Sequence, residues 1–347
     1  MRELVLVLPD LFLHAGENPL SASAALSLRF DAPRRIRGGW RGLLARGAGR
    51  EDLALIDEAS VIDATLRASV AGLSQSIAAP EPLPEAWLAT PLHLQAGLKT
   101  LHFPPHGLLR LRPDEAQQLA QEFARVFGAD GLELVPAGSA GFVLRGLAAA
   151  GVLTVDPARL IGGPLEESLP AGAGSAQLRA LASEIEMWLH EAPLNRTRAE
   201  RGEPTVSTLW LWGGGQPPRD PIVRQPRGPG ARWDRLFGED AWTQALAQLA
   251  GLPFGGTMSN WAALRAADRT AGERDECWCV VLPLADRGLE TLEREFLAPL
   301  VRELHDGRVG ALVIAANDRW TRLAASDRYR FWRPRRSLLE AVADAAV

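Results

Sequence analysis

Short, continuous runs of apolar residues recur along the chain, separated by segments in which apolar residues return with a helical period. Such runs cover residues 4–8, 207–212, 277–284 and 309–315. A continuous apolar run of about four to eight residues is typical of a strand buried on both faces of a parallel sheet. The helical period of 3.6 residues predicts helices at residues 112–127, 176–190, 241–250, 257–266 and 289–305.

Two further segments are assigned from their composition. Residues 233–237 are expected to be helical, and the Tyr-Arg-Phe-Trp sequence at 329–332 predicts an antiparallel edge strand.

The order of these elements predicts an α/β fold with two domains. Strand, helix and strand in succession imply right-handed parallel crossovers and a mostly parallel sheet flanked by helices. The Pro-Glu-Pro-Leu-Pro sequence at residues 80–84 predicts a linker, because clustered prolines stop regular structure. We therefore expect an α/β core domain of residues 1–85 and 200–347, with a small α+β domain inserted at residues 86–199.

Composition narrows the classes of partner. The net charge of −4 and the pI near 5.9 argue against a nucleic acid or an anionic membrane as the main partner. Asp10 interrupts the apolar N-terminal run, which argues against a signal peptide, and no run approaches the ~20 apolar residues of a membrane span. Cys277 and Cys279 alternate on a predicted strand, too close for an easy disulfide, so we expect a cytoplasmic protein.

Three acidic residues follow predicted core strands: Asp10, Asp286 and Asp318. Because the carboxyl ends of parallel strands meet at one sheet edge, these carboxylates could gather there, and they are our candidate catalytic residues. A hard divalent metal ion is one interpretation, and a set of unrelated helix caps is the other. The spacing does not choose between them. Ser60 is the serine we would select as a nucleophile, although the sequence places no activating base beside it.

A glycine-rich turn ends the Trp-rich strand at residues 207–212. Gly213, Gly214 and Gly215 follow that strand and precede two prolines. Glycines at the end of a core strand let the main chain approach a ligand, a loop or a packed helix closely. No Gly-Lys-Ser/Thr follows, so the turn is not a phosphate loop by pattern.

A resemblance to a known family begins just before this turn. An Asn-x-x-Arg element (Asn195 and Arg198), an Arg-Gly pair at residues 201–202 and the Trp-x-Trp-Gly-x-Gly sequence at 210–215 resemble the archaeal-type cofactor-independent phosphoglycerate mutases. These enzymes belong to the alkaline phosphatase superfamily. The resemblance implies a two-metal phosphotransferase, with a phosphorylated Ser or Thr and with Asp and His ligands holding manganese or zinc.

The chain departs from the family pattern at the expected ligands. Asp10 matches the acidic residue after the first strand. Asp286 matches the start of an Asp-x-x-x-His segment whose histidine position is Glu290 or a close neighbour here. Asp318 matches an Asp-His pair whose partner is Arg319 here. An arginine puts a fixed cation where a metal ion would sit. We therefore expect no bound cofactor, with manganese or zinc only if the metal site is intact.

The resemblance implies a phosphoglycerate mutase-like protein whose catalytic centre has degenerated, acting as a binding or regulatory module. The alternative is an active metal-dependent phosphomutase or phosphatase that interconverts phosphoglycerates. The residues expected to contact a small anionic metabolite are Asn195, Arg198, Gly213, Gly214, Gly215 and Arg319. A protein partner fits a regulatory module as well.

Overall fold

The structure is a computed structural model of the chain. It describes residues 1–11, 28–70, 85–96, 101–104, 107–160, 165, 168–215, 222–225, 230–271, 276–284 and 288–343. The chain divides into two compact units, one formed by Met1–Ala54 with Gln225–Val347 and the other by Leu55–Arg224. The narrower limits expected from the sequence for the inserted domain, residues 86–199, stay a prediction.

The first unit is built around a mostly parallel sheet of seven strands in the order β12-β11-β13-β1-β14-β15-β2. β1, β11, β12, β13 and β14 run parallel to one another, and β15 and β2 are antiparallel to their neighbours. The strands span Glu3–Val7 (β1), Arg34–Arg35 (β2), Arg235–Phe237 (β11), Phe254–Gly255 (β12), Cys277–Val281 (β13), Ala311–Ala316 (β14) and Arg319–Ala324 (β15). The central strands β1, β13 and β14 are buried along their whole length, as the continuous apolar runs predict.

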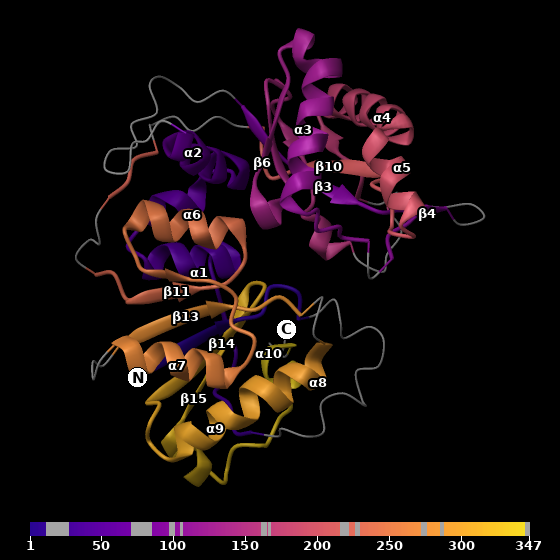
Figure 1. Ribbon diagram of the computed structural model, residues 1–347. Helices are drawn as coiled ribbons and strands as arrows, with labels where there is room; N and C mark the ends of the chain where they lie inside the picture. Colours follow the sequence, from indigo (N-terminus) through magenta and orange to yellow (C-terminus); the bar gives the residue numbers. More distant parts are fainter. Residues whose placement is uncertain are drawn as a thin grey trace. The chain divides into compact units, whose positions relative to one another are not determined.

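Helices cover both faces of this sheet (Figure 1). Alternate residues of the central strands, such as Leu6 of β1, share one core cluster with α7, α8, α9 and α10. The other face is covered by α1 and α6, where Trp40 and Trp242 meet edge to face with ring centroids 6.1 Å apart. The helices span Gly39–Gly47 (α1), Ala241–Ala250 (α6), Trp261–Ala271 (α7), Gly288–Leu292 (α8), Ala298–His305 (α9) and Leu338–Ala343 (α10).

The second unit is an α+β structure around an antiparallel sheet in the order β10-β3-β7-β6. Its core lies between this sheet and the helices α3 and α4, and α2 packs against β3 and β7. The elements span Glu58–Val70 (α2), Ala86–Leu92 (β3), Pro113–Phe127 (α3), Glu133–Pro136 (β6), Phe142–Arg145 (β7), Ser175–Glu191 (α4), Pro193–Glu200 (α5) and Thr208–Trp212 (β10). Short two-stranded ladders join Gln95–Ala96 to Leu101–His102 and Val152–Leu153 to Ala171–Gly172.

The sheet of the first unit confirms the expected α/β fold, with a mostly parallel sheet flanked by helices. Two local expectations were wrong. Residues 233–237 include strand β11 rather than a helix, because five residues are too few to tell a helical period from a strand. Tyr329 ends a 3₁₀ turn, Ala325–Tyr329, and residues 330–332 form no strand.

None of the helices in the described ranges combines the length and apolar character needed to cross a membrane. Cys277 and Cys279 are both buried on β13 and are free thiols. Burial raises the pKa of both thiols.

Candidate functional site

Asp10 lies at the carboxyl edge of the parallel sheet, just after β1. Both of its carboxylate oxygens accept a hydrogen bond from the backbone N–H of Leu284, each at 2.8 Å. Leu284 follows the neighbouring strand β13, which pairs with β1 in parallel register. Asp10 is 5 % exposed. Its carboxylate therefore ties together the segments that leave two adjacent core strands.

Asp318 lies at the same edge but in a different setting. β14 and β15 form a hairpin in which Ala316 pairs with Arg319, so Asn317 and Asp318 are the two turn residues. Asn317 has a φ of 50°, which asparagine tolerates better than most residues. The carboxylate of Asp318 is 56 % exposed and lies 3.8 Å from Nε of Arg319. A pair this exposed contributes about 0–1 kcal/mol.

The first turn of α1 packs against this hairpin. The backbone N–H of Ile36 donates to the carbonyl oxygen of Asp318. A Cβ added to Gly39, which has a φ of 62°, would lie 3.4 Å from the carbonyl oxygen of Asn317. The N-cap residue of α1, Gly38, has no side chain, and the N–H of Gly39 donates to the carbonyl oxygen of Ile36. The positive end of the helix dipole and the Arg319 side chain, which is 21 % exposed, add positive charge beside Asp318 at this corner of the sheet edge.

The structure describes two of the three acidic residues that the sequence places at this edge. Asp10 and Asp318 follow the adjacent parallel strands β1 and β14, as expected, whereas Asp286 lies outside the described residues. Within the described ranges, no group of three or more His, Cys, Asp or Glu side chains is arranged to hold a metal ion. Both described carboxylates have partners without a metal ion, because Asp10 accepts from the N–H of Leu284 and Asp318 lies beside Arg319.

Asn195 and Arg198, two residues of the resemblance motif, lie in the second unit. The amide of Asn195 donates to the carbonyl oxygens of Leu189 and Val206 at 2.7 and 2.8 Å, and its oxygen accepts from the N–H of Val206 at 2.8 Å. The guanidinium of Arg198 donates to both carboxylate oxygens of Glu115 at 2.9 Å. These contacts join α4, α5 and α3 to the start of β10, and a role in substrate binding stays a prediction.

The glycine turn after β10 packs against its own unit. The carbonyl oxygen of Gly213 accepts from the N–H of Ala59, at the start of α2, at 2.8 Å. A Cβ on Gly214 would lie 1.9 Å from the carbonyl oxygen of Ala86, and one on Gly215 would lie 2.8 Å from the ring of Trp87. These glycines are therefore required by close backbone packing. Whether they also contact a substrate stays a prediction.

Ser60 is buried in the first turn of α2, with 2 % of its surface exposed. Its hydroxyl oxygen has no hydrogen-bond partner in the part of the chain that the structure describes. In this conformation a substrate has little access to the hydroxyl.

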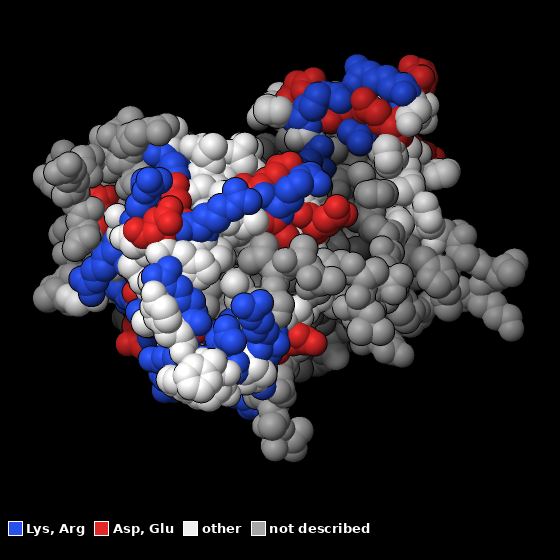
Figure 2. Space-filling model, turned by 90° about the horizontal axis from the view of Figure 1, so that it is seen from below, with Lys and Arg blue, Asp and Glu red and all other residues white. Residues whose placement is uncertain are grey.

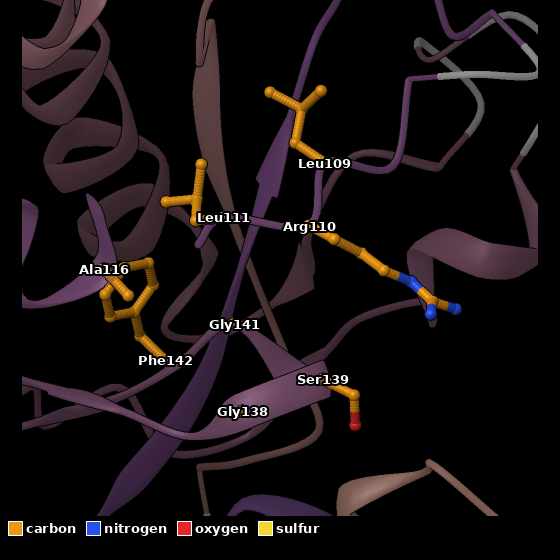
Figure 3. A pocket seen from close by; sticks show the side chains of 8 residues that line it. All are labelled: Leu109, Arg110, Leu111, Ala116, Gly138, Ser139, Gly141 and Phe142. Carbon is orange, nitrogen blue, oxygen red and sulfur yellow. The ribbon is translucent and has the colours of Figure 1, made fainter. Parts of the chain in front are cut away.

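A small pocket lies in the second unit, with a volume of about 180 Å³ (Figure 3). Leu111, Ala116 and Phe142 form one side of it, and the side chain of Arg110 extends away from them. The residues that line it are Leu109, Arg110, Leu111, Ala116, Gly138, Ser139, Gly141 and Phe142. None of the residues selected from the sequence belongs to this set.

Sequence reasoning missed a buried acid on the face of the sheet covered by α7 to α10. Glu293 is 2 % exposed and begins a π-helical turn, Glu293–Leu297, between α8 and α9. Among the residues that the structure describes, neither its Oε1 nor Nε1 of Trp261, on the adjacent helix α7, has a hydrogen-bond partner. Burial raises the pKa of Glu293 to about 7, and the charge of Glu290 acts in the same direction. The sequence contains a sign of this buried acid, because Glu293 occupies a position on the apolar face of the helix expected at residues 289–305.

The fold and the sheet edge define a mixed α/β protein with candidate residues at the carboxyl ends of parallel strands. No model of a known protein family and no curated protein matches the sequence. Among solved structures, the chain is similar to the cofactor-independent phosphoglycerate mutase from Thermoplasma acidophilum DSM 1728. The identity is 12 %, the match covers 100 % of this chain and 96 % of that one, and the TM-score is 0.41.

It is also similar to the PH0037 protein from Pyrococcus horikoshii, at 10 % identity, with 98 % of this chain and 91 % of that chain covered and a TM-score of 0.46. At these values neither likeness assigns an activity or a residue role.

Proposed function

We propose that the chain is a phosphoglycerate mutase-like protein of the alkaline phosphatase superfamily that binds a small anionic ligand without metal-dependent turnover. The sequence resemblance at residues 195–215 supports the family. The observation that carries the rest is the position of Asp10, whose two oxygens both accept from the N–H of Leu284. This hydrogen bond favours the ionised carboxylate, so Asp10 can hold the sheet edge together without a metal ion.

The surroundings of Asp318 support the same proposal. A two-metal centre stabilises both the attacking and the leaving oxygen of phosphoryl transfer and needs several uncommitted ligands. Asp318 is instead an exposed turn residue beside Arg319, whose guanidinium cannot be deprotonated to become a ligand. The same cation, near the start of α1, suits a phosphate or carboxylate group.

Metal content tests the proposal directly. The purified chain is incubated with Mn²⁺ or Zn²⁺, passed through a desalting column and measured by inductively coupled plasma mass spectrometry. We expect no stoichiometric metal. Two tightly held ions per chain would favour the active enzyme. Conversion of 2-phosphoglycerate to 3-phosphoglycerate, stimulated by metal at high enzyme concentration, would refute the proposal outright.

Ligand binding is tested by thermal unfolding with 2- or 3-phosphoglycerate. A ligand selective for the folded chain at about 100 times its Kd stabilises it by about 2.7 kcal/mol and raises the midpoint. We expect Arg319→Gln to abolish that rise. The exposed Arg308, in the same unit, gives the matched control Arg308→Gln, which should keep it. No rise with the unmodified chain, or equal loss in both variants, would contradict binding at this edge.

A further inference from the structure

Three large aromatic side chains protrude into solvent just after β15. Tyr329 is 67 % exposed, Phe331 80 % and Trp332 68 %. We call these three residues the aromatic turn. Isolated exposed apolar residues are common, but three large exposed rings within four positions, two of them in contact, are of the kind that marks an interaction site.

Arginines alternate with these rings. The segment 328–336 contains Arg328, Arg330, Arg333, Arg335 and Arg336 and no acidic residue. Figure 2 views the end of the first unit at which β15 and α9 lie in Figure 1, and shows Arg side chains gathered there around uncharged ones. Arg335 is exposed and forms no ion pair with any other residue that the structure describes.

Ion pairs beneath the aromatic turn fix its shape. Nε of Arg330 lies 3.1 Å from the carboxylate of Asp327, which is 2 % exposed. Arg333 contacts the carboxylates of Asp31 and Asp327. The Asp327 carboxylate thus lies on the inner side, Asp31 is 26 % exposed, and these pairs hold Arg330 and Arg333 in place. Because these ion pairs already hold the turn in place, the rings need little further ordering when a partner binds. This lowers the entropic cost of binding.

The ring geometry narrows the choice of partner. Phe331 and Trp332 meet edge to face, with centroids 5.3 Å apart and planes at 80°. The guanidinium of Arg328 lies 4.7 Å from the centroid of the Tyr329 ring. Successive bases of a single-stranded nucleic acid stack on open, parallel ring faces, which this arrangement does not present. A second copy of the chain docked patch to patch would bring arginines against arginines.

We propose that the aromatic turn docks on the surface of an anionic phospholipid membrane, with its rings at the level of the headgroups and its arginines on the lipid phosphates. Aromatic side chains favour the membrane–water interface, and clustered arginines favour anionic lipid. The net charge of −4 argues against an anionic membrane as a partner of the whole surface, but a local patch can still dock, because salt screens charges farther away than a Debye length of about 8 Å. A protruding turn also needs no matching groove in its partner.

The test is co-sedimentation of the full chain with vesicles of phosphatidylcholine alone or with roughly 30 % phosphatidylserine. At about 0.15 M salt we expect binding to the anionic vesicles, weaker binding to phosphatidylcholine, and a marked decrease in affinity at about 0.5 M salt. The double variant Phe331→Ser with Trp332→Ser should bind about tenfold more weakly or worse. Arg335→Glu should bind about five- to twentyfold more weakly, since each cation near the surface counts for about fivefold.

Matched controls come from exposed positions elsewhere. Leu55 is 88 % exposed and Arg125 lies on the solvent face of α3 without an ion pair to a described residue. Leu55→Ser removes an exposed apolar side chain and Arg125→Glu reverses an exposed charge, as the test variants do at the aromatic turn. Both controls should leave vesicle binding unaltered. Unchanged thermal midpoints of all variants verify that each is folded.

Absence of binding to anionic vesicles by the unmodified chain overturns the proposal. An equal decrease in vesicle affinity for Arg125→Glu and Arg335→Glu would also overturn it. So would a vesicle affinity that does not change with lipid charge or salt concentration. Two further measurements cover other partners: fluorescence anisotropy with a labelled oligothymidine and analytical ultracentrifugation. If the double variant abolishes oligonucleotide binding or self-association while vesicles are not bound, the turn serves that partner instead.

Discussion

A single carboxylate joins the two strands that flank the candidate site. Asp10 is buried, and both its oxygens accept from the buried N–H of Leu284. Removal of the carboxylate in Asp10→Ala leaves that N–H without its acceptor, which costs about 1–3 kcal/mol. We expect a decrease of this size in the free energy of unfolding, measured by urea denaturation.

Asp318 provides the control for this change. It is an exposed turn residue, so Asp318→Ala should alter stability by no more than about 0.5 kcal/mol. An equal effect of the two substitutions would show that Asp10 does not tie the sheet edge together.

The turn after β10 requires a glycine at position 214. A Cβ on Gly214 would lie 1.9 Å from the carbonyl oxygen of Ala86 and 2.9 Å from Cα of Trp87, and backbone atoms cannot swing aside as a flexible side chain can. Gly214→Ala should therefore cost about 1–3 kcal/mol or prevent folding. Thermal unfolding followed by circular dichroism measures the loss.

Gly128, in the same unit, has open space where its Cβ would be and a φ of −65°. Gly128→Ala should be neutral or stabilising by up to about 1 kcal/mol. A tolerated Gly214→Ala would contradict the close packing of β10 against β3.

The buried carboxyl of Glu293, in the π-helical turn Glu293–Leu297, should make the free energy of unfolding depend on pH. Burial, with the charge of Glu290, raises the pKa of Glu293 from 4.5 to about 7. Between these values the folded chain holds a proton that the unfolded chain releases. The free energy of unfolding therefore falls as pH rises through this window and is level above it. Glu293→Gln removes this term, so the variant should exceed the unmodified chain by about 1–3 kcal/mol at a pH near 8.

Urea denaturation from pH 4.5 to 8 measures the difference between the two proteins. Glu295→Gln makes the same charge change at an exposed position and should not alter the slope. A difference between Glu293→Gln and the unmodified chain that stays constant with pH would contradict a proton held by Glu293.

Periodicity predicted the long elements well, and it failed where local sequence is ambiguous. The apolar runs of β1, β13 and β14 and the helical pattern of α3 and α4 have lengths that only one element type fits. β15 was missed because its alternation is interrupted by half-exposed arginines. The aromatic turn was assigned to a strand because exposed rings have the same β propensity as buried ones.

At the scale of the whole molecule, the sequence could place Asp10 and Asp318 at one sheet edge, because parallel strands impose that placement. It could not predict that Leu284, 274 positions away in sequence, would engage both oxygens of Asp10. Nor could the Asn195 and Arg198 motif reveal its contacts with Val206 and Glu115, since these depend on how α3 and α5 pack.

The boundaries of the second unit depend on contacts between segments that lie far apart in the sequence. Residues 86–199, the domain expected from the sequence, leave out α2 and β10. β10 is the neighbour of β3 in the sheet, and Leu209 and Leu211 belong to the core between the sheet and α4. Without β10, the hydrogen-bonding edge of β3 and this part of the core would be open to water, which a small domain cannot offset.

We therefore expect the fragment 55–224 to unfold in one cooperative thermal transition and the fragment 86–199 to lack one, as followed by near-ultraviolet circular dichroism of the buried tryptophans. Cooperative unfolding of 86–199 would instead support the limits drawn from the sequence. Failure of both fragments would mean that the second unit depends on the rest of the chain, because neither boundary would then enclose a core sufficient to offset the entropy of folding.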